Sequence, residues 1–488
     1  MNRRALLSAR PGSPRLSTFT GYTAFTETTD LSGLSAFTGA GLEEVAPHLY
    51  VLRSDTLDAV RLDIVVGAGQ GHQDKLLQAL FTNRLLREGT RHHTSAELAE
   101  KLDYYGAWLE LTVSVHHSYL TLYTLKRYAC ETFALVGEML HEPLFPEERL
   151  RIISANNKSQ YLVNRQRADV IARRLFNRAV YGDNHPCGRF AEEKDFDAIT
   201  RDDLLRFFTT YYRPDNCNIY LAGNVDDNLI EAAKKSLSLT PSQGGETLAE
   251  AQLSFGQNTL SLTSPSLGGG RGEALSQEEG TLAEAQLSFG QNTPSLTSPS
   301  LGGGRGEALI HHLPSAVQAS IRMGGLLMDV ASDDYYRMRV VTTILGGYFG
   351  SRLMKSIRED KGYTYSISAD MLTNTRQVLF VVSSEALADK GEVIADEVRQ
   401  HCRRLAEERV PDDELTMVRN YMIGEICRNY EGAFSLIDAY IYIHTLGLPL
   451  EHISRTIDTV RSIDAETIRQ TAAQWLDADR FHTVIVAP

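Results

Sequence analysis

The chain has 488 residues, more than one hydrophobic core supports, so several domains are expected. Apolar residues make up 42% and charged residues 23%, which is ordinary for a globular protein and excludes a collagen-like or wholly disordered chain. Because 62 acidic residues outweigh 49 basic ones, for a net charge of −13, no global basic field attracts phosphate backbones and no nucleic-acid partner is expected.

The N-terminal residues 1–42 are interpreted as a polar, disordered arm. Their first part carries four arginines, many Ser and Thr residues and one acidic residue, Glu27, a composition that also resembles an organellar transit peptide. Elsewhere, five scattered cysteines without a Cys-x-x-Cys spacing favour reduced thiols over a disulfide framework. No apolar run approaches the roughly 18–20 residues that cross a bilayer, so no membrane span is expected. The predicted location is cytoplasmic, with an organelle as the alternative.

A first folded half is predicted over residues 43–237, where β-rich runs alternate with amphipathic helical patterns. Thr94 or Ser95 is a candidate N-cap of its second helix. The predicted strands are 60–66, 108–115, 118–125 and 217–222, and the predicted helices are 75–87, 94–106, 130–141, 147–164, 168–181 and 201–211.

Residues 238–309 are interpreted as a flexible linker. A stretch at 247–275 is repeated at 281–309 with one change, Leu260 against Pro294, at a spacing of 34 residues. Two copies are too few for a solenoid, and their Ser, Gly and Pro content cannot bury enough apolar surface to offset chain entropy. A tandem duplication within a surface loop explains the repeat better.

The second folded half, 310–488, repeats the rhythm of the first. Its predicted strands are 316–323, 366–371, 378–383 and 481–486, and its predicted helices are 333–345, 390–407, 412–430 and 465–476. The same order of mixed elements twice indicates a duplicated α/β unit. The segments that end the two halves, YYRPDNCNIYLAGNV and WLDADRFHTVIVAP, are expected to be counterparts.

Five separated phrases carry a family resemblance. They are EGT at 88–90, EPLF at 142–145, HPCGR at 185–189, YYRPDN at 211–216 and GGYFGSRLMKSIREDKGYTYSIS at 346–368. In this order they resemble the insulinase/pitrilysin family of zinc peptidases, in particular the branch that contains mitochondrial processing peptidase. The resemblance implies an α/β (α+β) fold of two homologous halves, each a mixed, mostly antiparallel sheet with packed helices, joined by the long flexible linker.

The zinc motif of that family is missing. Active members carry His-x-x-Glu-His shortly before the Gly-Thr pair, with both histidines on one helix face as zinc ligands and the Glu as general base. Leucine cannot bind a metal, asparagine cannot take a proton from water, and arginine puts a fixed positive charge where the zinc belongs. We therefore expect no metal or other cofactor on this chain and no metallopeptidase activity from it alone. The positions concerned are Leu80 and Arg84 for the histidines, Asn83 for the base, and Asn156 or Asn157 for the distal Glu ligand.

Three pairs of adjacent histidines are the remaining candidates for a metal site, at 92–93, 116–117 and 311–312. Neighbouring residues on a strand point to opposite faces, so such a pair seldom chelates one ion. Ordinary surface or core histidines are the preferred interpretation.

The second half keeps a motif that family members use on substrate, an Arg and a Tyr seven residues apart. Here it is represented by Arg358 and Tyr365. The guanidinium suits a peptide carbonyl or carboxylate, and the phenol suits a developing oxyanion. The alternative is a helix-to-strand turn with Arg358 solvated, Gly362 as a C-cap and Tyr365 packed. The upstream glycines at 346, 347 and 350 fit either a close-approach loop or tight packing.

The resemblance implies a non-catalytic, substrate-binding subunit of a heterodimeric zinc metallopeptidase. A homologous partner subunit would hold the zinc, while Arg358 and Tyr365 would contact a peptide or unfolded polypeptide substrate in trans. The alternatives are a catalytically dead scaffold subunit of a larger assembly, an active zinc peptidase with an unrecognised metal site, and a clamp that binds peptide without cleaving it.

Overall fold

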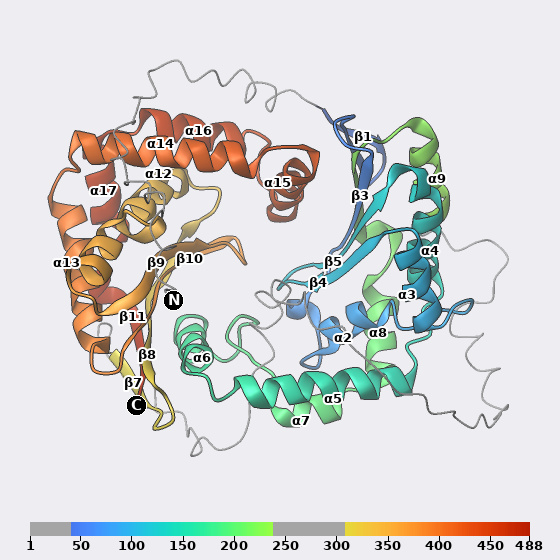
Figure 1. The fold of residues 1–488 in the computed structure, drawn as a ribbon, viewed down its shortest axis with the longest axis horizontal. Coiled ribbons are helices and arrows are strands. Elements are labelled where there is room, and N and C mark those ends of the chain that lie inside the picture. The colour runs from blue at the N-terminus through green and yellow to red at the C-terminus, as the bar shows by residue number, and fades with distance from the viewer. Residues whose placement is uncertain (1–40, 238–307) are drawn as a thin grey trace, which may run out of the picture. The chain divides into compact units, whose positions relative to one another are not determined.

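Two β-sheets organise the protein, whose computed structural model describes residues 41–237 and 308–488 (Figure 1). The predicted arm and linker lie outside these residues, apart from their last two positions each. The strands of the first sheet are β1 (Leu42–Ala46), β2 (Leu49–Arg53), β3 (Ala59–Val66), β4 (Trp108–Val113), β5 (Ser118–Leu125) and β6 (Cys217–Gly223). Those of the second are β7 (Ala308–His312), β8 (Gln318–Asp329), β9 (Thr364–Leu372), β10 (Gln377–Leu387) and β11 (His482–Ala487).

The two sheets have the same topology. The first has the order β1-β2-β6-β3-β5-β4 and the second the order β7-β11-β8-β10-β9, so the second matches the first without β1. Each sheet contains one parallel pair, β2 with β6 and β7 with β11, and all its other pairs are antiparallel. The expected fold class of two mixed, mostly antiparallel halves is confirmed, and the segments expected to be counterparts provide β6 and β11 at equivalent positions.

Helices surround both sheets. The first half has α2 (Gln78–Leu85), α3 (Ser95–Tyr104), α4 (Ala129–His141), α5 (Glu147–Asn164), α6 (Ala168–Tyr181), α7 (Glu193–Ala198), α8 (Arg201–Tyr211) and α9 (Asp227–Leu237). The second has α12 (Asp333–Thr342), α13 (Gly391–Glu407), α14 (Asp412–Asn429), α15 (Ala433–Leu446), α16 (His452–Ser462) and α17 (Ala465–Trp475). Short 3₁₀ turns are η1 (Gln70–His72), η2 (Lys126–Tyr128), η3 (Pro214–Asn216) and η7 (Ala478–Arg480), and two π-helical segments are η5 (Thr343–Gly347) and η6 (Met354–Asp360).

Most predicted elements are present, and the exceptions have local causes. Helices α5, α6 and α8 have the predicted bounds, and Thr94 caps α3 in a capping box with Glu97. Helix α2 begins at Gln78, three residues later than predicted, because Leu77 has a left-handed φ of 73°. The predicted helix 333–345 divides into α12 and the π-helical η5. The sequence patterns do not predict seven of the elements, namely β1, β2, β7, α7, α9, α15 and α16.

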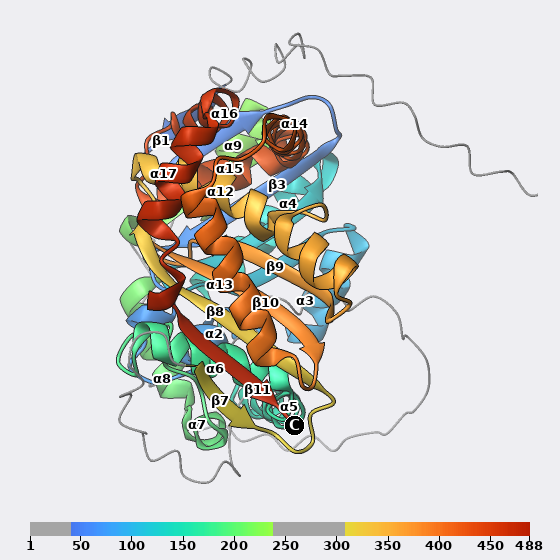
Figure 2. The ribbon, with the colours of Figure 1, turned by 90° about the vertical axis from the view of Figure 1, so that its left-hand side faces the viewer.

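Each sheet is covered by a helix from the opposite half. On the second sheet, α13 contacts β8 and β11 from one side and α17 packs on α13 (Figure 2), while α6 of the first half packs on β8 and β11. The residues that join there are Ile171, Ala172, Phe176, Leu379, Val381, Val484 and Val486. In return, α15 packs on β2 and β6 of the first sheet through Ile437, Tyr440 and Ile441.

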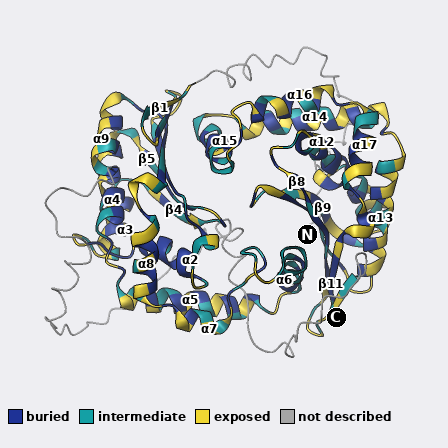
Figure 3. Cartoon of the chain, turned by 180° about the vertical axis from the view of Figure 1, so that it is seen from behind, coloured by how far each residue is buried: buried dark blue, intermediate teal, exposed yellow. Residues whose placement is uncertain are grey.

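The side chains of β3 point alternately to the two faces of the first sheet, and both faces are covered. Val60, Leu62 and Ile64 lie in the core of the first half, and the burial of the strands is visible in Figure 3. The intervening residues, Arg61 and Asp63, are also buried, at 5% and 2% exposure, on the side where α15 packs. A strand with both faces covered needs a partner for every polar side chain it buries.

An ion-pair network joins α15 to that strand. Arg61 donates from Nε and Nη2 to Asp63 at 2.8 and 2.9 Å, from Nη2 to Asp438 at 2.5 Å and from Nη1 to the carbonyl oxygen of Phe434 at 3.1 Å. Thr121 also donates to Asp63 at 2.7 Å. Burial raises the pKa of Asp63, and the Arg61 guanidinium opposes that rise. The Asp63 carboxylate therefore depends on Arg61 for its charge.

We predict that Arg61→Met lowers the free energy of unfolding by about 3–5 kcal/mol, because it leaves a buried carboxylate unpaired and frees α15. Chemical denaturation followed by circular dichroism measures this loss. The control is Arg151→Met, which removes an exposed arginine paired with Glu148 on α5 and leaves the midpoint unchanged. Equal midpoints for the two variants would contradict the prediction.

Candidate functional site

Two of the positions predicted to correspond to zinc ligands, Arg84 and Asn157, meet in space. Arg84, near the end of α2, donates from Nη1 to Oδ1 of Asn157 on α5 at 2.6 Å. Asn157 is buried and donates in turn to the carbonyl oxygen of Ile153 at 2.7 Å, whereas Asn156 is exposed. Asn157 is thus the member of the pair that faces α2. This hydrogen bond directly joins the side chain at the predicted position of the second histidine to the side chain at the predicted position of the distal ligand.

Asn83, at the position of the general base, is built into the sheet. Its side chain is fully buried and donates from Nδ2 to the carbonyl oxygens of Thr112 at 2.8 Å and Tyr119 at 3.1 Å. Its Oδ1 accepts from the hydroxyl of Tyr212 at 3.2 Å. Burial raises the pKa of Tyr212, which keeps that hydroxyl protonated as a donor. The amide therefore fixes α2 to β4 and β5 and has no free atom for a water molecule.

These residues do not fit a zinc ion. Leu80 is apolar, and Arg84 is a cation on the helix face that would hold the metal. Within 41–237 and 308–488, no three His, Cys, Asp or Glu side chains are grouped so that they could hold a metal ion. The adjacent histidines at 92 and 93 pair separately, His92 with Glu142 and His93 with Glu138, both at 2.9 Å.

We predict that the triple variant Leu80→His, Arg84→His, Asn157→Glu binds about one zinc ion per chain, because Arg84 already reaches Asn157 and Leu80 lies one helical turn before Arg84 on α2. Atomic absorption after dialysis against zinc measures the content. The control is Leu80→His alone, which keeps the Arg84 cation and stays at the parent level. A triple variant that binds no more zinc than the parent would show that these positions do not converge as ligands.

The Arg/Tyr motif forms a compact aromatic and cationic cluster. Arg358 lies on η6 and Tyr365 at the start of β9, and the turn between them is closed by Gly362 at a φ of +65°. The guanidinium carbon of Arg358 is 5.3 Å from the ring centroid of Tyr365 and 4.5 Å from that of Phe349. The structure thus brings the two predicted residues together. Phe349, which the sequence did not indicate as a site residue, packs on the same guanidinium.

Exposure separates the two interpretations of this motif. Gly362 does close the helical segment, as the turn interpretation expected. Tyr365, however, is 82% exposed and Phe349 65% exposed, so neither ring packs into the core. Large exposed aromatic side chains that flank an arginine are typical of a binding surface. We refer to Phe349, Arg358 and Tyr365 as the aromatic-arginine cluster.

The glycines before this cluster serve packing in at least one case. A Cβ atom on Gly346 would lie 2.7 Å from the backbone nitrogen and the Cβ of Ala369, so η5 can approach β9 only with glycine there. Gly347 has only ordinary contacts within reach. The tight-packing interpretation therefore holds for Gly346.

The fold and the residues at the predicted metal positions can be compared with those of known proteins. Residues 198–422 match the family described as Peptidase M16 inactive domain. A Bacillus subtilis (strain 168) protein named "Uncharacterized zinc protease YmxG" is 19% identical over 437 residues, which cover 89% of this chain and 94% of that protein. A Helicobacter pylori protein named "Non-peptidase homolog YmxG" is 21% identical over 410 residues, which cover 82% of each.

Solved structures share the fold. The crystal structure of a peptidase M16 inactive domain from Pseudomonas fluorescens superposes with a TM-score of 0.70 at 17% identity, covering 90% of this chain and 95% of that one. A protease from Helicobacter pylori superposes with a TM-score of 0.69 at 13% identity, covering 90% and 97%. The expected resemblance is confirmed: the chain is similar to proteins described as M16 peptidases or their inactive domain, and its sequence contains no His-x-x-Glu-His.

Two further expectations concern location. None of the helices within 41–237 and 308–488 combines the length and apolar character that a membrane crossing requires. The two curated relatives named above are bacterial, so they lend no support to the organellar alternative.

Proposed function

We propose that this protein is the non-catalytic, substrate-binding subunit of a heterodimeric zinc peptidase. A homologous partner subunit holds the zinc, and this chain contributes its aromatic-arginine cluster to the peptide in trans. The observation that carries the proposal is the contrast between two sites. The side chains at two of the predicted metal-site positions, Arg84 and Asn83, are engaged in part-buried hydrogen bonds, while Tyr365 and Phe349 are exposed beside Arg358.

The chemistry of the cluster suits a polypeptide. Arg358 offers several donors in a plane to a peptide carbonyl or carboxylate, and the Tyr365 hydroxyl offers one donor to an oxyanion at the scissile bond. Phe349 supplies an apolar surface for a substrate side chain. The cluster lies at the start of β9, which is the edge strand of its sheet among the described residues. An edge strand presents unpaired backbone groups to which an extended peptide can add.

The first sheet supports the same function. Its edge strand on the side of the degenerate site is β4, which contacts α2 and accepts a hydrogen bond from Asn83. In the proposed complex, an extended polypeptide could add to edge strand β4 or to edge strand β9, and the partner subunit would supply the zinc. In this proposal the complex works in a cytoplasm, on peptides or unfolded polypeptides.

We predict that Tyr365→Phe lowers the kcat of the two-chain complex by about 100-fold, because it removes one oxyanion donor. Arg358→Ala should raise KM about 10- to 100-fold, since it removes a charged hydrogen-bond donor to the substrate. Steady-state cleavage of a fluorogenic peptide by the reconstituted complex measures both. The matched controls are Tyr104→Phe and Arg337→Ala, an exposed tyrosine and an exposed arginine outside the cluster, which leave the kinetics unchanged. Parent-like kinetics in both cluster variants would rule out the substrate contact.

We also expect native co-purification of the tagged chain to recover an equimolar partner of similar size that carries an intact His-x-x-Glu-His. Mass spectrometry identifies the partner, and metal analysis places the zinc on it. A large assembly without such a subunit would instead indicate the scaffold alternative. Zinc-dependent cleavage by the isolated chain would contradict the non-catalytic assignment.

A further inference from the structure

A cavity of about 330 Å³ lies where α6 covers the second sheet. Its walls come from α6, from strands β8, β9 and β10, from the residues around the start of α2, and from the segment between α6 and α7. This volume is at the lower end of the range for small-molecule sites. Most of its lining is apolar, including Leu77, Leu80, Phe176, Leu379 and Val381.

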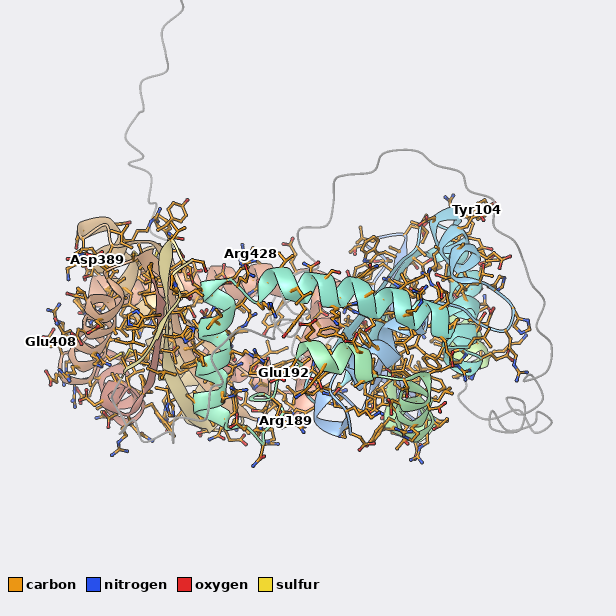
Figure 4. All side chains as sticks on the ribbon, turned by 90° about the horizontal axis from the view of Figure 1, so that it is seen from below. Tyr104, Arg189, Glu192, Asp389, Glu408 and Arg428 are labelled. Atoms are coloured by element: carbon orange, nitrogen blue, oxygen red, sulfur yellow. The ribbon has the colours of Figure 1, made fainter. Side chains whose placement is uncertain are left out.

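Among the residues that the structure describes, the charged side chains lining this cavity are the cations Arg173, Arg189 and Arg322, with no aspartate or glutamate beside them. Arg189 is exposed on the segment between α6 and α7, where Figure 4 labels it, and thus marks the solvent side of the cavity. Figure 4 also shows α6 beside the second sheet and α5 leading back toward the first half. Arginines in the wall of an apolar cavity can pair with an anion that has an apolar body.

Arg322 lies on β8, the central strand of the second sheet. Its Nη1 donates to the hydroxyl of Ser383 at 3.0 Å, whereas its Nε is buried and has no hydrogen-bond partner among the residues of 41–237 and 308–488. Three carboxylates act on it electrostatically, Glu385, Asp169 and Asp370. None of them forms an ion pair with it, and the hydroxyl of Ser320 donates to Glu385 at 2.6 Å instead.

Arg322 lines the cavity, and burial lowers its pKa by disfavouring the charged form. An anion bound against the part of the guanidinium that faces the cavity would favour the charged form again. A carboxylate fits the planar donor fork of arginine better than any neutral group. Apolar atoms attached to that carboxylate would contact Phe176, Leu379 and Val381.

We propose that this cavity is a binding site for an apolar monocarboxylate, with the carboxylate on Arg322 and its apolar group against α6 and the second sheet. Two sources share this chemistry, a medium-chain fatty acid and the C-terminal residue of a short hydrophobic peptide. Described residues of this chain line the cavity, so the proposal can be tested on the purified full-length protein.

Isothermal titration calorimetry with two matched probe pairs tests the proposal. One pair is octanoate and octanol, and the other is acetyl-Leu-Leu with a free carboxylate and its C-terminal amide. We expect at least one acid to bind about 10-fold or more tightly than its neutral analogue. Preference in the first pair assigns a fatty acid as the source, and preference in the second assigns a peptide C-terminus.

Variants locate the binding. Arg322→Met should abolish the preference for the acid, and Arg322→Lys should keep part of it because the charge remains. Arg337→Met, an exposed arginine on α12, should leave binding unchanged. If Arg322→Met does not fold, the comparison of Arg322→Lys and Arg189→Met with the parent replaces it, and both should bind the acid more weakly. Equal affinity for acid and neutral probes, no binding at about 1 mM, or parent-like affinity in the arginine variants would overturn the proposal.

Discussion

The reciprocal covering of the two sheets is the constraint on which the rest of the structure depends. Each sheet packs its own helices on one face and receives a helix from the opposite half on the other, α15 on the first sheet and α6 on the second. A sheet of this composition cannot leave an apolar face in water, so neither half is complete alone. The buried ion pair of Arg61 with Asp63 makes the contact of α15 with the first sheet specific, because Arg61 also reaches the more exposed Asp438 on α15.

The degenerate metal site follows from the same requirement for satisfied burial. A helix that has lost its metal would leave polar groups without partners between α2, α5 and the first sheet. Here Arg84 bonds Asn157, and Asn83 bonds two strand carbonyls and Tyr212, so the region is stable on its own hydrogen bonds. The structural role of these helices is retained, while the chemistry of a zinc-bound water is not available from these residues.

Much of the fold was predictable because local patterns and burial agree. The alternation of β3, the capping box before α3 and the periodicity of α5, α6 and α8 each indicate the element that forms. Helix α15 escaped prediction because its sequence, AFSLIDAYIYIHTL, is apolar around much of its circumference and has little helical period. That composition suits a helix packed on a sheet of the other half, a contact that no local pattern reveals. Helix α2 started late for a comparable reason, since the left-handed backbone of Leu77 has no signal in sequence.

The sequence by itself determined which chemistry is missing, because a leucine, an asparagine and an arginine cannot replace histidine and glutamate at the metal positions. It also determined the duplicated order of elements and the spacing of Arg358 and Tyr365. Only the tertiary structure decided that Asn157, and not Asn156, faces Arg84. It alone also showed that Phe349 joins the aromatic-arginine cluster and that Arg322 lines a cavity beside α6. These contacts depend on which faces of elements far apart in the sequence pack together. That packing is not determined by the local conformational preference of either segment.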